Sequence, residues 1–191
     1  SHIPPANLSR EEEEDGLVRG NEAIQALTGQ KARGYRSPSW DLSPNTIDLL
    51  LAHGFTYDSS MMGHDHLPYR ARTGDVVAVD APMVFGRETP LIEMPISWSL
   101  DDYPHFEYVR IGTSVAPGLR DAGSVLTNWI DDFLYMKETC DWGVLTYTCH
   151  PYVIGRGHRI MMLERLIRRL LDEGAVFMTM EEAAAEYAAR G

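Results

Sequence analysis

The sequence lacks the features that mark several classes of protein. Its 191 residues contain no run of about 18 or more apolar residues, so no segment is expected to span a membrane. It has only two cysteines, Cys140 and Cys149, and their spacing fits neither a disulfide framework nor a metal-binding motif. We therefore expect Cys149 to be a small core residue and not a nucleophile.

Positive charge is also scarce. The chain has 17 lysines and arginines against 28 aspartates and glutamates, a net charge of −11. Nucleic-acid-binding proteins carry basic patches, so this balance argues against a nucleic-acid partner. The first residues, 1–5, are neither basic nor apolar enough for a signal peptide, and the localisation stays open between the cytoplasm and the cell envelope.

Local patterns predict helices that alternate with short strands. Ser9 with Glu12 forms a capping box for a helix over residues 9–28, and Thr179 with Glu182 forms another for the last helix. Ser43 and Pro44 are placed as N-cap and first residue of a second helix. Further helices are expected over 124–138 and 158–173, with strands at 33–36, 55–58, 76–79, 91–96, 143–149 and 175–178. This order predicts one α/β domain with a parallel sheet over residues 1–191.

His150 follows the predicted strand 143–149 and precedes a proline that ends it. In a sheet of βα units the carboxyl ends of the strands share one edge, where ligands bind. Other polar and aromatic residues follow strands in the same way: Arg36, Trp40, Asp58, Trp98, Asp101 and Asp102. Tryptophan faces stack on sugar rings and histidine can donate a proton, so the set suits hydrolysis of a polar, ring-bearing substrate. Buried tryptophans and solvated charge pairs explain the same pattern equally well.

Several separate segments resemble the polysaccharide deacetylase family (NodB-like, carbohydrate esterase family 4). They are residues 34–40, 43–46, 54–60, 98–104 and 149–164, and they follow one another in the order of the family. The resemblance covers nearly the whole chain. The most similar branch is the bacterial one with peptidoglycan deacetylase-like and allantoinase-like members.

This resemblance implies a distorted, often seven-stranded (β/α) barrel. It also implies a hydrolase that cleaves an N-acetyl amide, or a related carbon–nitrogen bond, with zinc or another divalent metal. The chain departs from the family because it has no Asp-Asp-Gly and no His-x-x-x-His motif. His2 matches the second histidine of the latter motif, which makes it a metal ligand. A complete barrel needs about 250 residues. We therefore expect this chain to be the C-terminal part of a longer protein, with the first strands and the other metal ligands upstream.

The resemblance also assigns roles to residues. His150 is the general acid that protonates the leaving amine, and Arg36 orients the catalytic base. Asp101 or Asp102 tunes the histidine or contacts the substrate. The substrate groove is lined by Pro38, Trp40 and Trp98.

The implied substrate is an N-acetylated polysaccharide or peptidoglycan sugar. Two alternatives remain: hydrolysis of a small cyclic amide, as in allantoinase-like relatives, and a non-catalytic module that kept the fold. Exposed sheet edges in a partial barrel would favour a homo-oligomer.

Overall fold

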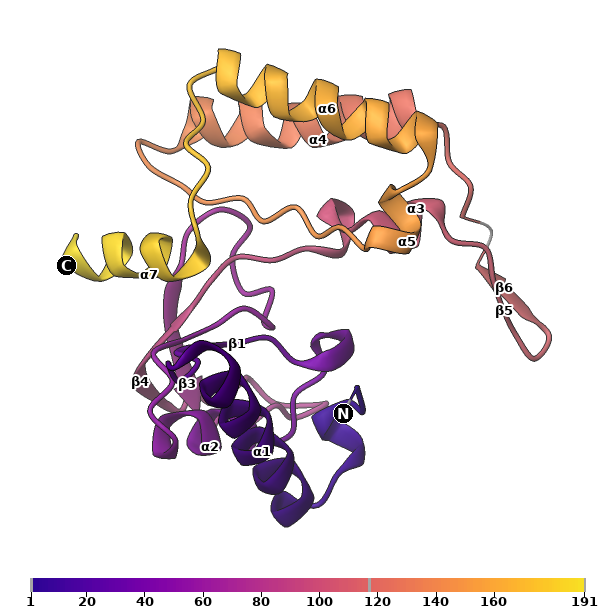
Figure 1. The fold of residues 1–191 in the computed structure, drawn as a ribbon. Helices are drawn as coiled ribbons and strands as arrows, with labels where there is room; N and C mark the ends of the chain where they lie inside the picture. The colour runs from indigo at the N-terminus through magenta and orange to yellow at the C-terminus, as the bar shows by residue number, and fades with distance from the viewer. Residues whose placement is uncertain (1, 117, 191) are drawn as a thin grey trace. The chain divides into compact units, whose positions relative to one another are not determined.

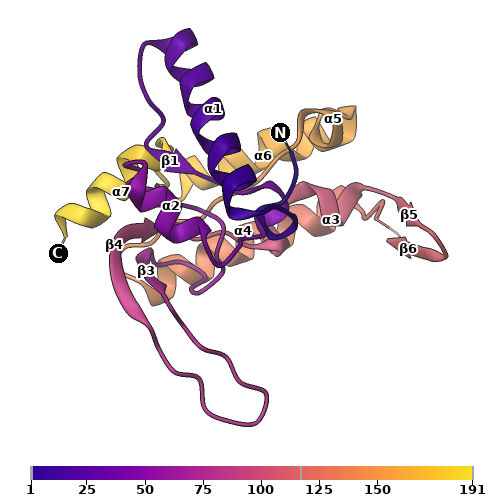
Figure 2. The same cartoon turned by 90° about the horizontal axis from the view of Figure 1, so that it is seen from below.

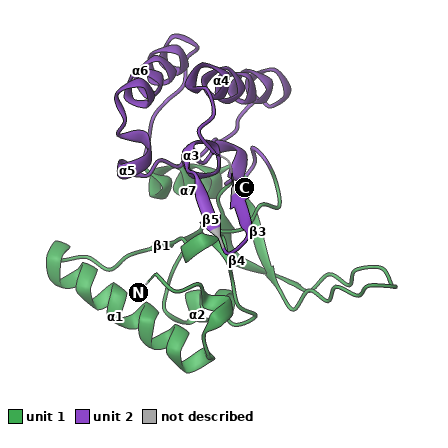
Figure 3. Cartoon of the chain, turned by 90° about the vertical axis from the view of Figure 1, so that its right-hand side faces the viewer, with its two compact units in different colours: residues 1–64, 68–95, 179–191 green, residues 65–67, 96–178 purple. Residues whose placement is uncertain are grey.

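The computed structural model describes residues 2–116 and 118–190 (Figure 1). The chain separates into two compact units, which Figure 3 distinguishes by colour. Unit 1 comprises residues 1–64, 68–95 and 179–191, and unit 2 comprises residues 65–67 and 96–178. The assignment of residues 1–191 to a single domain, and the closed barrel, stay predictions.

Unit 1 is built on a four-stranded sheet with the order β1-β2-β4-β3. Strands β1 (Gly34–Tyr35), β2 (Tyr57–Asp58) and β4 (Arg87–Glu93) are parallel, and β3 (Tyr69–Thr73) pairs antiparallel with β4. The helices of this unit are α1 (Arg10–Thr28), α2 (Thr46–Ala52) and α7 (Met180–Ala189), with 3-10 turns at Pro5–Asn7 and Pro38–Trp40. The parallel sheet, with β1 and β2 joined through α2, confirms the predicted α/β class.

Both capping boxes are confirmed. The Glu12 backbone N–H donates to Ser9 Oγ at 3.2 Å, and the Ser9 N–H donates back to Glu12 Oε2 at 2.9 Å. Thr179 and Glu182 repeat the arrangement at the start of α7. These contacts satisfy N–H groups that the first turn of a helix leaves without partners, which explains why the sequence marks both starts so clearly.

Helix α2 begins at Thr46, so the predicted start at Ser43 and Pro44 is wrong. The Ser43 hydroxyl donates to Glu13 Oε2 at 2.6 Å and accepts the Asn45 N–H at 2.9 Å. The Thr46 hydroxyl also donates to Glu13, at 2.5 Å. Because the Ser43 side chain is bound to a carboxylate of α1, residues 43–45 form a turn and the helix starts after it.

The predicted strand at residues 76–79 is wrong as well. These residues lie in a long arm between β3 and β4, which Figure 2 shows extending away from the sheet. Val76 forms an isolated bridge with Val84, and Val77 and Val79 are exposed. The β-branched residues gave the strand signal, but an exposed arm offers no packed surface to stabilise a strand.

Unit 2 contains most of the helices that follow residue 96. They are α3 (Asp102–Phe106), α4 (Ala122–Thr139), α5 (Pro151–Ile154) and α6 (Gly157–Asp172), with a 3-10 turn at Trp98–Leu100 and a hairpin of β5 (Val109–Ile111) and β6 (Ser114–Ala116). Helices α4 and α6 lie side by side (Figure 1). Their facing side chains form the core of the unit, with Trp129, Met162 and Leu166 almost fully buried.

Residues 143–149 and 175–178 are not strands, so both of these predictions are wrong. The first segment is extended, and Thr148 forms an isolated parallel bridge with Asp101. Thr148 N–H donates to the Leu100 carbonyl at 2.9 Å, and Asp102 N–H donates to the Thr148 carbonyl at 3.0 Å. A strand requires a ladder of backbone hydrogen bonds along its length, and within the described residues this segment has backbone bonds to other segments only near its two ends, from Val144 N–H to the His66 carbonyl and at Thr148. No helix in the described part of the chain is both long and apolar enough to cross a bilayer.

Candidate active site

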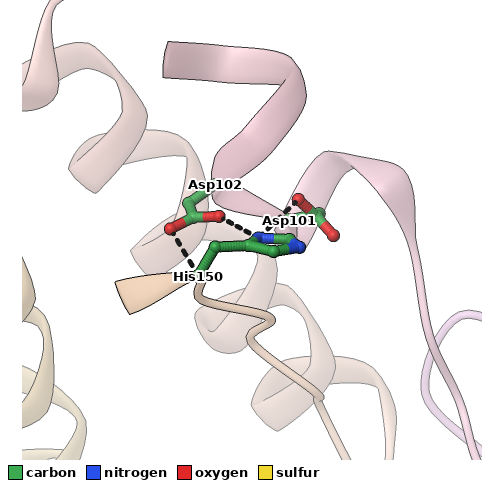
Figure 4. Close-up of side chains that lie close together, drawn as sticks. All are labelled: Asp101, Asp102 and His150. Atoms are coloured by element: carbon green, nitrogen blue, oxygen red, sulfur yellow. Dashed lines mark hydrogen bonds and ion pairs between the residues drawn. The ribbon is translucent and has the colours of Figure 1, made fainter. Parts of the chain in front are cut away.

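His150 and Asp102 form a closely bonded pair in unit 2 (Figure 4). His150 Nδ1 lies 2.7 Å from Asp102 Oδ1, and the His150 backbone N–H donates to Asp102 Oδ2 at 2.9 Å. Asp102 is fully buried, whereas 37% of the His150 side chain is exposed. The buried carboxylate of Asp102 therefore fixes the orientation of the His150 imidazole, and the exposed side of that ring is accessible to a ligand.

Local structure explains how two residues 48 positions apart meet. Asp102 is the first residue of α3, and His150 is the N-cap of α5. The two backbone hydrogen bonds of Thr148 join the segment before His150 to the start of α3. His150 was predicted at the end of a strand, and it instead stands between an extended segment and a short helix.

The structure also distinguishes the two neighbouring aspartates. Asp101 Oδ1 is 3.9 Å from His150 Nδ1, beyond hydrogen-bond distance, and accepts the Tyr103 N–H at 2.7 Å. Asp101 therefore caps α3, while Asp102 bonds the imidazole directly. The sequence left open which of the two contacts the histidine, because adjacent residues in a short turn can point either way.

The hydrogen bond to Asp102 determines which nitrogen of the His150 ring can exchange a proton with a ligand. When Nδ1 carries a proton it donates to Asp102, which leaves Nε2 as the atom that can exchange a proton with a ligand. The rings of Tyr103 and Tyr152 lie 5.7 Å and 5.9 Å from that of His150, centre to centre. The arrangement is that of a positioned proton donor.

The same three residues do not fit a metal ion as they are arranged. Asp101, Asp102 and His150 are the described residues that bring three candidate ligand atoms within 4.8 Å of one another. Two ligands of a tetrahedral zinc lie about 3.4 Å apart, given metal–ligand bonds of about 2.1 Å. His150 Nδ1 and Asp102 Oδ1 are 2.7 Å apart, which is a hydrogen-bond distance, and both Asp102 oxygens are already bonded to His150.

Cys149, next to His150, is an unreactive thiol. Burial, together with the nearby carboxylates of Asp102 and Asp101, raises its pKa to about 12. A nucleophilic cysteine needs the opposite surroundings, because the thiolate is the reactive form. Cys149 packs against the core of unit 2, as the sequence predicted.

Unit 1 holds four of the other predicted site residues: His2, Arg36, Pro38 and Trp40. Arg36 is half-buried, and its guanidinium donates to Ser59 twice, from Nε to the carbonyl at 3.1 Å and from Nη2 to Oγ at 2.9 Å. Pro38 begins a tight turn in which Ser39 and Trp40 have φ angles of 56° and 55°. Positive φ is unfavourable for a bulky residue such as tryptophan, so this turn stores backbone strain.

A buried pair of acids lies next to Ser59, the residue that Arg36 contacts. Asp58 and Glu93 are paired across the parallel strands β2 and β4 and are fully buried. Burial raises the pKa of Asp58, and burial with the charge of Asp58 raises the pKa of Glu93 to about 9. Glu93 Oε1 accepts the N–H groups of Ser60 and Met61, each at 2.7 Å.

The sequence predicts Asp58 at the ligand-binding edge of the sheet, with a solvated charge pair as the alternative, and does not single out Glu93. The available signal was a lone glutamate inside an apolar strand, where a charged residue is rarely tolerated without a partner. Of the remaining predicted residues, Trp98 is 41% exposed and starts a 3-10 turn in unit 2, and His2 is exposed in unit 1. That the residues of both units meet at one edge stays a prediction.

Three known proteins resemble the chain over nearly its whole length, although no family model matches it. A peptidoglycan deacetylase of Helicobacter pylori is 35% identical over 205 residues, an alignment that covers all of this chain and 68% of the relative. A crystal structure from Mycobacterium smegmatis, assigned provisionally as a polysaccharide deacetylase, has 27% identity and a TM-score of 0.78. It is matched over 99% of this chain and 60% of its own length. The Puue allantoinase, at 19% identity and a TM-score of 0.70, covers 97% of this chain and 55% of its own, and shares the fold.

The identity to the Helicobacter enzyme is carried across the full chain and includes both units. The Mycobacterium smegmatis structure, which is assigned provisionally as a polysaccharide deacetylase, shares the fold of this chain. The chain belongs to the NodB-like polysaccharide deacetylases, a family of hydrolases that act on carbon–nitrogen bonds other than peptide bonds.

Proposed function

We propose that this chain belongs to a metal-dependent hydrolase that removes the acetyl group from an N-acetylated polysaccharide or a peptidoglycan sugar. The observation that carries the proposal is the His150–Asp102 pair, a partly exposed imidazole held by a buried carboxylate. The similarity to a peptidoglycan deacetylase supports the substrate class.

In this proposal His150 is the catalytic acid. Hydrolysis of an amide requires a proton on the departing nitrogen, because a free amide anion is a very poor leaving group. A protonated His150 donates that proton from Nε2, while Asp102 keeps the ring oriented and balances its positive charge. Asp101 adds a second buried negative charge 3.9 Å from Nδ1.

Arg36, Pro38, Trp40 and Trp98 complete the proposed site. Arg36 donates to Ser59 twice, which gives its guanidinium one orientation and supports the proposal that it orients the catalytic base. Trp98 has the exposure needed to stack on a sugar ring, and the strained turn at Trp40 is the kind of backbone found where a side chain must be aimed.

The described residues supply one proposed ligand for the metal, His2. When bound, zinc or another divalent ion would polarise the amide and activate water. His2 is the proposed ligand, but a catalytic zinc takes three protein ligands, and His2 belongs to no group of three among the residues described. We propose no step that depends on the ion.

Release of acetate from an N-acetylated glycan by the full-length protein tests the proposal. We expect the wild type to release acetate and free amine in equal amounts. His150→Ala should keep the fold and lose at least about 100-fold in kcat, the range for one acid–base group. The control His53→Ala removes a histidine that pairs with Glu14 on unit 1 and should stay active. A His150→Ala variant with wild-type turnover contradicts the proposal.

A second candidate is hydrolysis of a small cyclic amide, favoured by the fold shared with an allantoinase. The same preparation assayed with allantoin distinguishes the two, since activity on allantoin without acetate release selects the small substrate. No turnover of either substrate, with no metal bound to the full-length protein, would identify a non-catalytic module.

A further inference from the structure

Arg159 is a buried charged residue for which the proposed reaction gives no role. It is the third residue of α6, and only 6% of it is exposed. Burying a guanidinium costs free energy unless its donors are bonded, and buried ion pairs are often replaceable by apolar residues without loss of stability. Since stability alone does not require a buried guanidinium, we use the hydrogen bonds of Arg159 to infer its role.

Those contacts join the ends of two short helices. Arg159 Nη1 donates to the Val153 carbonyl in α5 at 2.8 Å, and Nη2 donates to the carbonyl of Phe106, the last residue of α3, at 3.2 Å. The guanidinium also lies 4.7 Å from the centre of the Phe106 ring, and Glu107 lies 3.6 Å from Nη1. Arg159 thus bridges the C-terminal ends of α3 and α5.

The same two helices carry the proton donor and its carboxylate at their other ends. Asp102 begins α3 and His150 caps α5. Near these residues the Thr148 backbone bonds join the start of α3 to the segment that leads into α5. At the other ends Phe106 and Val153 pack in one core cluster, and Arg159 adds directional hydrogen bonds to both of their carbonyls.

We propose that Arg159 is a positioning residue that holds α3 and α5 at a fixed angle and so keeps His150 Nδ1 within hydrogen-bond distance of Asp102. The planar fork of arginine suits this task, because two of its donors reach two carbonyls at once in a fixed geometry. Lysine has one donor centre and cannot reproduce it. The proposal rests on the proposed function only where it predicts a loss of activity.

The experiment uses the full-length protein with Arg159→Met, Arg159→Lys and the control Arg168→Met. Arg168 lies on the same helix and pairs with Glu164 on the exposed surface. Two readouts are needed: kcat and KM on the N-acetylated glycan, and the low-field proton NMR signal of the His150 Nδ1–H bonded to Asp102, identified by its loss in His150→Ala.

Arg159→Met should lower kcat by about 10- to 100-fold, the effect of a small misplacement of a catalytic group. Its KM should change by less than about 2-fold, because substrate contacts are intact. The His150 signal should broaden or vanish. Arg159→Lys should give intermediate values, and Arg168→Met should match the wild type in both readouts.

Wild-type kcat and an unchanged signal in Arg159→Met would overturn the proposal. If that variant does not fold, Arg159→Lys decides, and a lysine variant with the wild-type signal and kcat would reduce Arg159 to a structural role. If the wild type itself lacks activity but Arg159→Met loses the signal, the proposed function fails while the positioning role of Arg159 stands.

Discussion

The carboxyl groups of Asp58 and Glu93 are buried beside each other inside unit 1. They face each other across β2 and β4, and Asp58 Oδ2 and Glu93 Oε2 are buried oxygens that accept no bond from any other described group. A proton between the two oxygens satisfies both. The pKa of Glu93, raised to about 9 by burial and by the charge of Asp58, indicates that Glu93 carries this proton at neutral pH.

Stability should therefore fall as the pH rises, and Glu93→Gln should remove this dependence. Between the ordinary pKa of 4.5 and about 9, the folded state keeps a proton that the unfolded state has lost. The free energy of unfolding then decreases with pH, by up to about 1.4 kcal/mol per unit for one proton. Glutamine keeps a donor toward Asp58 and an acceptor for Ser60 and Met61. Urea unfolding at about pH 5, 7 and 9 measures the slope.

Glu93→Ala is the contrasting variant. It leaves the buried N–H groups of Ser60 and Met61 without an acceptor and should be less stable than Glu93→Gln at every pH. A wild-type protein whose stability is constant over this pH range would show that the shared proton is absent.

Asparagine substitutions should separate the two aspartates beside His150. Asp102 accepts from two N–H groups of His150, and an asparagine has only one oxygen to offer, so its amide N–H₂ would oppose a donor. We expect Asp102→Asn to lose about 100-fold in kcat. Asp101→Asn keeps the cap on α3, since asparagine is a good N-cap, and should lose far less. Equal losses in steady-state assays would contradict this division of roles.

Arg36→Lys tests the orientation of the guanidinium on Ser59. Lysine retains the charge but cannot donate to the Ser59 carbonyl and hydroxyl together, so the group becomes mobile. We expect kcat to fall by about 10-fold or more, with little change in the thermal unfolding midpoint. Arg33→Lys is the matched control, because Arg33 is an exposed residue that pairs with Glu181. Unimpaired turnover in Arg36→Lys would remove Arg36 from the site.

The helices could be predicted from the sequence because their signals are local. A capping box such as Ser9 with Glu12 acts within one turn, and the structure preserves it. The start of α2 was misplaced because Ser43 is bonded to Glu13, 30 residues away, which no local pattern reveals. The predicted strands at 33–36, 55–58 and 91–96 overlap β1, β2 and β4. The prediction for residues 143–149 failed because a ladder depends on continuous pairing, and among the described residues this segment has backbone bonds to other segments only at Val144 and Thr148.

The residues of the candidate site could be predicted from the sequence, but the hydrogen bonds between them could not. His150, Asp101 and Asp102 could be selected from the sequence, but which carboxylate bonds the ring depends on the turn into α3. Glu93 and Arg159 were missed because their roles arise from partners in distant segments, Asp58 for one and the carbonyls of Phe106 and Val153 for the other.

The raised pKa of the Cys149 thiol makes the residue next to His150 resistant to oxidation and alkylation. Oxidants and alkylating reagents attack thiolates, and a pKa of about 12 leaves almost none at neutral pH. The carboxylates of Asp102 and Asp101, which lie beside His150, also disfavour a charged sulfur on Cys149. The same buried acids that contact the imidazole therefore protect the neighbouring thiol from modification.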